Sequence, residues 1–229
     1  MSGYLLLEGG AEFGGLMSVP DLKALELAGG VDASIRIIPT AAAPDKNDGR
    51  AGQNGVNWFK KLGARNVEAV RLIDKTSADE TQVASVLRSA KLIYLLGGFT
   101  HYLAQTLTGS ACWQAVLEAY QAGAVIAGSS AGAMVLSQFY FDPVSGEVFD
   151  GLNLVPKTLV LPHHNTFGKG WAARLAARLP GITLLGIDER TGMLSKNADG
   201  QWSVLGGGSI TVYRGGKPEN HAAKTNFLL

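Results

Sequence analysis

The chain has 229 residues, of which 46% are hydrophobic and only 17% carry a charge. This composition supplies a core and excludes an intrinsically disordered chain, because disordered chains are rich in charge and poor in apolar residues. The 20 basic and 19 acidic side chains give a net charge of +1, which argues against nucleic acid or a membrane surface as a partner. The single cysteine, Cys112, excludes an intramolecular disulfide framework and a multi-cysteine zinc site.

Short apolar runs alternate with helix-like segments along the chain. In chain order we expect a strand at 4–7, a helix at 20–28, a strand at 34–38, a helix at 50–62, a strand at 67–72, a helix at 78–90 capped by Ser77 with Glu80, a strand at 92–96, a helix at 111–122, a strand at 124–127, a helix at 131–137, a strand at 158–161, a helix at 169–179, a strand at 182–187 and strand segments from 192 to 213. This alternation predicts one α/β domain over residues 1–229. We expect a mostly parallel sheet with helices on both faces and a C-terminal β extension.

Two segments bear on location. Residues 1–7 contain no basic segment and are followed by Glu8, so we expect no secretory signal and a cytoplasmic protein. Residues 119–141 carry no charge and are long enough for a membrane span. Because they contain Gln121, Gln138 and a Gly-Ser-Ser-Ala-Gly sequence, a buried strand, turn and helix is the better interpretation.

The carboxyl ends of the expected strands are where ligands bind in sheets of this kind. The polar or glycine-rich segments that follow these strands are Gly9-Gly10, Thr40, Gly97-Gly98, Ser129-Ser130, His163-His164 and Asp188-Glu189. These segments are therefore where we look for a site.

Residues 128–132 form the only G-x-S-x-G sequence in the chain. A strand precedes it and a helix of small residues follows it, as in a nucleophile elbow, where the turn exposes the serine Oγ. Ser130 is the expected nucleophile, and the alternative is a serine that merely caps the helix. Backbone N–H groups of Gly98 and Ala131 would form an oxyanion hole, although a plain turn also explains the glycine.

A serine nucleophile needs a base, and imidazole suits this role near neutral pH. Adjacent histidines in a strand point to opposite faces, so only one of His163 and His164 should serve the site. A metal site on both histidines is a rival, but no carboxylate spacing supports it. His221 lies in a polar tail, residues 218–226, and is expected to be exposed.

A carboxylate should orient the base. Glu189 is the preferred acid because the order Ser130, His163, Glu189 places all three residues after strands. Asp142 and Asp150, in a hairpin-like stretch after the elbow, remain alternatives. We expect Asp188 to point away and bond backbone N–H groups as a turn residue.

The chain resembles the dipeptidase E and cyanophycinase family of serine peptidases over nearly its whole length. The similar motifs are 8–12 (EGGAE), 38–41 (IPTA), 96–98 (LGG), 128–133 (GSSAGA), 149–154 (FDGLNL) leading to 162–163 (PH), 186–189 (GIDE) and 204–208 (VLGGG). The resemblance implies a class I glutamine amidotransferase-like fold, peptide hydrolysis, no metal and no cofactor. It also implies exopeptidases that favour acidic residues or aspartate-derived polymers.

The chain departs from that family where substrate is selected. Phe99-Thr100 stands where dipeptidase E has an asparagine and cyanophycinase an Asp-Gln pair. The arginine-rich segment after the cyanophycinase histidine is replaced by residues 165–170. The candidate substrate contacts are Phe99, Thr100, His164, Lys169 and Arg174, the last two as cations for a substrate carboxylate.

These observations favour a serine exopeptidase that acts on dipeptides or short peptides, with a possible preference for acidic residues, through an acyl-enzyme. Ser130 would attack the carbonyl, His163 would carry the proton, and Glu189 would hold the imidazole. The alternatives are a non-catalytic binding module on the same fold and a cyanophycinase-like hydrolase. An amidotransferase-like enzyme would need a cysteine at the elbow. The sequence leaves a homodimer open.

Overall fold

The computed structural model describes residues 3–198, 200–215 and 217–229 and contains two β-sheets. The first sheet has the strand order β14 (Asn226–Leu228), β11 (Gln201–Gly206), β10 (Thr191–Lys196), β1 (Tyr4–Glu8), β5 (Val125–Ser129), β4 (Leu92–Leu95), β2 (Ser34–Ile38) and β3 (Asn66–Ala69). From β1 to β3 the neighbours are parallel, whereas β10, β11 and β14 add antiparallel strands beyond β1. This core of parallel strands with a β extension confirms the expected fold class.

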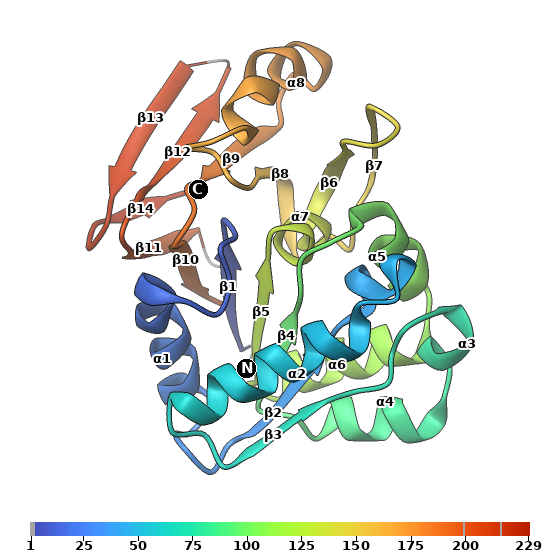
Figure 1. Ribbon diagram of the computed structural model, residues 1–229. Coiled ribbons are helices and arrows are strands. Elements are labelled where there is room, and N and C mark those ends of the chain that lie inside the picture. The colour runs from blue at the N-terminus through green and yellow to red at the C-terminus, as the bar shows by residue number, and fades with distance from the viewer. Residues whose placement is uncertain (1–2, 199, 216) are drawn as a thin grey trace.

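A second sheet, which the sequence analysis did not separate from the first, has the order β13 (Lys217–Ala222), β12 (Ser209–Arg214), β9 (Thr183–Ile187), β8 (Val155–Leu161), β6 (Ser137–Asp142) and β7 (Glu147–Asp150). Figure 1 shows it above the parallel strands of the first sheet, with α8 (Ala172–Arg178) beside it. The antiparallel β6–β7 pair is the hairpin expected after the elbow.

Helices cover both faces of the parallel strands because those strands are apolar on both sides. In β1, Leu6 packs with α1 (Ser18–Leu27) and α2 (Asp48–Lys61). Leu5 and Leu7 point the other way and pack with α4 (Thr81–Arg88) and α6 (Ala111–Gln121). The remaining helices are α3 (Lys75–Ala78), α5 (Thr100–Leu107) and α7 (Ala131–Leu136), with 3-10 turns at Gly15–Met17, Thr40–Asp45 and Gly168–Trp171.

Two local predictions were wrong. The helix expected at 78–90 with Ser77 as its cap is divided, because Asp74 caps α3 by accepting the Ser77 N–H and Glu80 adopts an extended conformation before α4 begins. The polar tail at 218–226 belongs largely to β13 and β14. There the His221 side chain is only 13% exposed and its ring stacks on Phe227.

The uncharged segment 119–141 contains the end of α6, then β5, α7 and most of β6. Within the residues that the structure describes, none of the helices combines the length and the hydropathy that a membrane crossing requires.

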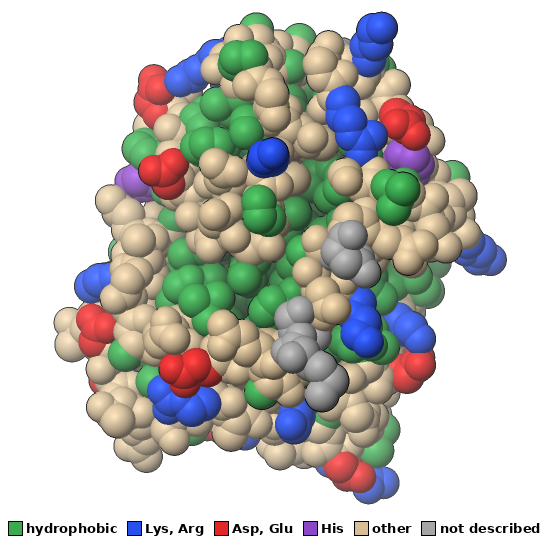
Figure 2. All heavy atoms as spheres, turned by 180° about the vertical axis from the view of Figure 1, so that it is seen from behind, with side chains coloured by type: hydrophobic (Ala, Val, Ile, Leu, Met, Phe, Trp, Pro, Cys, Tyr) green, Lys and Arg blue, Asp and Glu red, His purple; other side chains and the backbone are tan. Residues whose placement is uncertain are grey.

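Figure 2 shows basic and acidic side chains interspersed over the rear face rather than gathered by sign. This distribution agrees with the balanced composition.

Two carboxyl groups are buried beneath the carboxyl end of β1. The Glu8 side chain accepts a hydrogen bond from the Tyr94 hydroxyl, and Asp21 accepts one from Trp58 Nε1 at 2.8 Å. Both acids are fully buried. Burial raises the pKa of Asp21 to about 7, and burial together with the nearby Asp21 charge raises the pKa of Glu8 well above its usual range.

The Asp21 proton should make stability depend on pH. The unfolded chain loses this proton near pH 4 and the folded protein only near pH 7, so the stabilisation is complete at low pH and is lost as the pH rises between these values. We expect the free energy of unfolding to fall by about 1.4 kcal/mol per pH unit in this interval. Urea denaturation at a series of pH values measures this free energy. It should fall less steeply with pH in Asp21→Asn than in the wild type, whereas the exposed control Asp32→Asn should fall as steeply as the wild type. Equal slopes for wild type and Asp21→Asn would contradict this assignment.

Candidate active site

Ser130 occupies a strained turn between β5 and α7. Its backbone has φ 49° and ψ −112°, a combination that side chains rarely adopt, and its N–H donates to the Glu8 carbonyl at 3.0 Å. A Cβ on Gly128 would lie 2.5 Å from the Gly132 carbonyl carbon, and one on Gly132 would lie 2.2 Å from the Leu95 oxygen. Small residues are therefore required on both sides of the serine, as the G-x-S-x-G sequence predicts.

The structure brings Ser130, His163 and Glu189 together. Ser130 Oγ lies 3.1 Å from His163 Nε2, and His163 Nδ1 lies 2.8 Å from Glu189 Oε1. The three residues follow β5, β8 and β9 respectively, and the side chains of His163 and Glu189 are 20% and 27% exposed. A hydroxyl, an imidazole and a carboxylate in one chain of hydrogen bonds can activate a nucleophile.

His163 lies in a loop beyond β8 rather than in the strand itself. Its backbone is left-handed, with φ 51°, and its N–H donates to the Gly9 carbonyl at 2.8 Å. The imidazole ring stacks on Phe167 with 4.8 Å between ring centroids. A Cβ on Gly10 would lie 2.3 Å from His163 Cε1, so glycine is needed there for the ring to fit.

Further polar residues hold the Glu189 end of the chain, and the sequence analysis did not single them out. Asn165 accepts the Glu189 N–H through Oδ1 at 2.9 Å, and the Thr166 hydroxyl lies 3.5 Å from Glu189 Oε1. Asn165, Thr166 and Phe167 directly follow the histidine pair, and this proximity is the only sequence signal that could have identified them.

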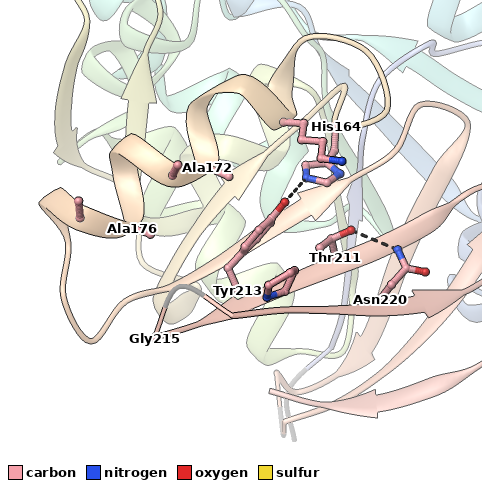
Figure 3. Close-up of a pocket in the computed structure, with 11 residues that line it drawn as sticks. His164, Ala172, Ala176, Thr211, Tyr213, Gly215 and Asn220 are labelled. Carbon is pink, nitrogen blue, oxygen red and sulfur yellow. Dashed lines mark hydrogen bonds between the residues drawn. The ribbon is translucent and has the colours of Figure 1, made fainter.

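His164 turns away from Ser130. Its Nε2 lies 2.9 Å from the Tyr213 hydroxyl, and its Nδ1 lies 3.5 Å from Asp188 Oδ1. Burial lowers the pKa of His164. Figure 3 shows His164 and Tyr213 on the wall of a cavity between α8 and strands β12 and β13, which has a volume of about 840 Å³. Ser130, His163 and Glu189 are not among the described residues that line this cavity.

The rival acids Asp142 and Asp150 lie in the β6–β7 hairpin. The Asp142 carboxylate accepts the Ser145 N–H at 2.9 Å and the Ser145 hydroxyl at 2.7 Å, in the turn between β6 and β7. Asp150 is exposed at the end of β7. Asp188 accepts the backbone N–H of Ser209 at 2.9 Å, so it bonds backbone as expected, although its partner lies on β12.

The two expected oxyanion-hole residues lie at this edge of the sheet. Gly98 has φ 138°, and a Cβ there would lie 2.3 Å from the Ala41 carbonyl oxygen. Ala131 is the first residue of α7, where backbone N–H groups have no partner within the helix.

The expected substrate contacts are more scattered. Phe99 is the extended N-cap residue before α5 and is 37% exposed, whereas Thr100 is buried with its hydroxyl 3.6 Å from the Met134 sulfur. Lys169 lines the cavity beside His164, and the Arg174 guanidinium lies over the Phe141 ring. The surroundings of Thr100 and Arg174 give no support for a substrate contact.

Other chemistries find little support among the described residues. Cys112 is buried in α6, and burial raises the pKa of its thiol to about 11, so it is unsuited to act as a nucleophile. In the ranges 3–198, 200–215 and 217–229, no three or more histidine, cysteine, aspartate or glutamate side chains are grouped so that they could hold a metal ion.

The comparisons with known proteins identify the family and with it the class of protein, a peptidase. A family model for peptidase family S51 matches residues 5–201, so the chain belongs to this family of peptidases, which includes the cyanophycinases and peptidase E-like proteins it resembles.

Curated relatives and solved structures agree with this membership. A cyanophycinase of Trichormus variabilis is 29% identical over 196 residues, which cover 81% of this chain and 64% of that protein. This chain therefore spans less than two thirds of the cyanophycinase. The crystal structure of a peptidase from an acI-B1 actinobacterium has a TM-score of 0.89 at 28% identity, and covers 100% of this chain and 98% of the other. A putative peptidase E protein from Listeria monocytogenes shares the fold, with a TM-score of 0.67 at 22% identity, over 90% and 99% of the two chains.

The fit between Gly10 and the His163 ring can be tested by one methyl group. Gly10→Ala should displace the ring from Ser130 Oγ and lower peptide hydrolysis by about 10²-fold, because misplacing a reacting group by about 1 Å costs this much. Gly14→Ala is the matched control in the same loop, because a Cβ there meets no atom within 4 Å and its φ is −156°. The assignment would be contradicted if the two variants had equal activity and both retained the native fold by circular dichroism.

Proposed function

We propose that this protein is a serine exopeptidase that hydrolyses dipeptides or other short peptides through an acyl-enzyme. The observation that carries the proposal is the unbroken chain of hydrogen bonds from Ser130 through His163 to Glu189. Membership of a peptidase family supplies the reaction class.

In the first step, Ser130 Oγ attacks the carbonyl carbon of the scissile peptide bond while His163 Nε2 accepts the hydroxyl proton. Glu189 accepts the Nδ1–H hydrogen bond, which fixes the imidazole tautomer and stabilises the imidazolium that forms. The N–H groups of Gly98 and Ala131 hold the negative oxygen of the tetrahedral intermediate.

In the second step, the imidazolium returns its proton to the leaving amine as the peptide C–N bond breaks, which leaves an acyl ester on Ser130. His163 then removes a proton from water as the water oxygen attacks the ester carbon. The imidazolium returns this proton to Ser130 Oγ as the ester C–O bond breaks, which releases the carboxylic acid product and restores the serine. These steps need only the side chains described above, together with water.

In this proposal residues 1–229 form one catalytic domain. Residues 1–2, 199 and 216 of this domain lie outside the described ranges. A single domain is supported by the positions of the three side chains, because both sheets contribute to the site. Ser130 follows a strand of the first sheet, and His163 and Glu189 follow strands of the second. An acidic preference is not part of the proposal, because the Arg174 guanidinium lies over Phe141 and Lys169 lies in the cavity beside His164.

A cyanophycinase-like hydrolase is the second candidate. The observation that favours it is the 29% identity with the Trichormus variabilis cyanophycinase, over the part of that protein which the chain spans. Incubation with cyanophycin and with a mixed dipeptide library, followed by mass spectrometry of the products, separates the two candidates.

The nucleophile has a matched control in the neighbouring residue. Ser130→Ala should lower peptide hydrolysis by about 10³-fold or more while the fold is retained. Ser129→Ala should remain active, because the Ser129 hydroxyl is buried and has no hydrogen-bond partner among the described residues. Both variants should be assayed on the dipeptide library. Full activity in Ser130→Ala would exclude Ser130 as the nucleophile, whereas a wild-type protein that binds peptides without hydrolysing them would favour a binding module.

The acid can be assigned by comparing two isosteric variants. Glu189→Gln should lower kcat by about 10² to 10⁴-fold with little change in stability, because the amide cannot stabilise an imidazolium. Asp142→Asn should leave kcat within a few-fold, because the amide oxygen that this change introduces can still accept the Ser145 hydrogen bonds. Steady-state kinetics in which Asp142→Asn is the more damaging change would transfer the acid role to Asp142.

A further inference from the structure

Glu12 lies beside Ser130, in the turn that follows β1. Its Oε1 accepts the Gly97 N–H at 3.1 Å. A Cβ placed on Gly97 would lie 2.6 Å from Glu12 Oε1 and 3.1 Å from Ser130 Cβ, so the carboxylate and the nucleophile lie against the same glycine. No step of the proposed mechanism uses this acid.

The loop around Glu12 is strained. Ala11 and Phe13, its two neighbours, both have φ 61°, the left-handed conformation that non-glycine residues seldom adopt. Strain of this kind persists only where the surrounding structure imposes it, and it is concentrated at functional sites. The backbone thus holds Glu12 in place at the edge of the sheet where Ser130 lies.

Glu12 also lines a cavity of about 380 Å³, together with Phe13 and Trp58, two asparagines of α2 and Lys61. The aromatic rings of Phe13 and Trp58 lie 6.5 Å apart. A carboxylate, aromatic rings and amide oxygens are groups that attract a nitrogen cation. The Lys61 ammonium illustrates this, because it lies over the Trp58 ring at 5.8 Å from its centre.

The Glu12 carboxylate has no cationic partner in the described part of the chain. Its one hydrogen bond comes from a backbone N–H, and none of the ion pairs of the structure includes it. The two cations expected to hold a substrate carboxylate, Lys169 and Arg174, lie elsewhere. The charge next to the nucleophile is therefore negative and unpaired.

We infer that Glu12 is a specificity-determining residue, and that its carboxylate binds a positively charged nitrogen on the substrate residue whose carbonyl Ser130 attacks. The inference rests on the proposed function for the position of that carbonyl. The nitrogen belongs either to a free α-ammonium group or to a lysine or arginine side chain. A residue with an acidic side chain is disfavoured at this position, because the negative charge of Glu12 would repel its carboxylate.

Two matched substrate pairs separate the sources of the nitrogen. The first pair is Lys-Ala and norleucine-Ala, of which only Lys-Ala has a side-chain ammonium group. The second pair is norleucine-Ala and N-acetyl-norleucine-Ala, of which only the unacetylated peptide has an α-ammonium group. We expect wild-type kcat/KM to favour the ammonium-bearing member of one pair by about 10- to 100-fold, the range of a charge-assisted hydrogen bond. Glu-Ala should be hydrolysed less well than norleucine-Ala. Equal kcat/KM within both pairs would overturn the inference.

Variants assign the preference to Glu12 itself. Glu12→Gln should reduce the ratio within the preferred pair to about 3-fold or less, and Glu12→Lys should make Glu-Ala better than Lys-Ala. Glu26→Gln is the matched control, because it removes one negative charge from the exposed end of α1, where Glu26 pairs with Lys23. A ratio that survives in Glu12→Gln would also overturn the inference.

A binding measurement separates this inference from the proposed function. Calorimetry on Ser130→Ala needs no turnover and compares N-acetyl-lysinamide, norleucinamide and N-acetyl-norleucinamide as ligands. A cationic ligand that binds about 10-fold or more tightly than the neutral one, and loses this advantage in Ser130→Ala/Glu12→Gln, supports the Glu12 site even if no peptide is hydrolysed. Equal affinities for all three ligands would refute the site while leaving a reactive Ser130 in place.

Discussion

The turn at Ser130 is the constraint on which the site depends. A backbone with φ 49° at a serine is unfavourable, and it is maintained because α7 packs so closely on β5 and β4 that only glycine fits at positions 128 and 132. The hydrogen bond from the Ser130 N–H to the Glu8 carbonyl ties the turn to the neighbouring strand β1. The strain therefore fixes the direction of the serine Oγ relative to the sheet edge.

The second sheet supplies the other two hydrogen-bonded side chains, and backbone contacts align it with the first. The His163 N–H donates to the Gly9 carbonyl, and the Arg190 N–H donates to the Gly10 carbonyl. The loop after β1 thus lies between the loops that carry His163 and Glu189. It also presents Glu12, whose carboxylate accepts the Gly97 N–H, so one short segment combines backbone alignment with an acid beside the serine.

The parts of this arrangement that follow local rules could be predicted from the sequence. The apolar strands, the small residues around Ser130 and the polar residues after each strand indicated the fold class and the three side chains that the structure brings together. The split between α3 and α4, the second sheet and the burial of His221 depend on tertiary packing, which no local pattern shows. Glu12 was noticed only within a motif, because its importance comes from contact with Gly97, 85 positions away.

Covalent labelling can show whether Ser130 is an activated nucleophile. Reaction of the whole protein with a fluorophosphonate, followed by digestion and tandem mass spectrometry, should place a single adduct on Ser130. The adduct should form far more slowly in His163→Ala, because the base would then be absent. An unlabelled Ser130 in the folded wild-type protein, or an adduct on another serine, would mean that Ser130 is not the activated nucleophile.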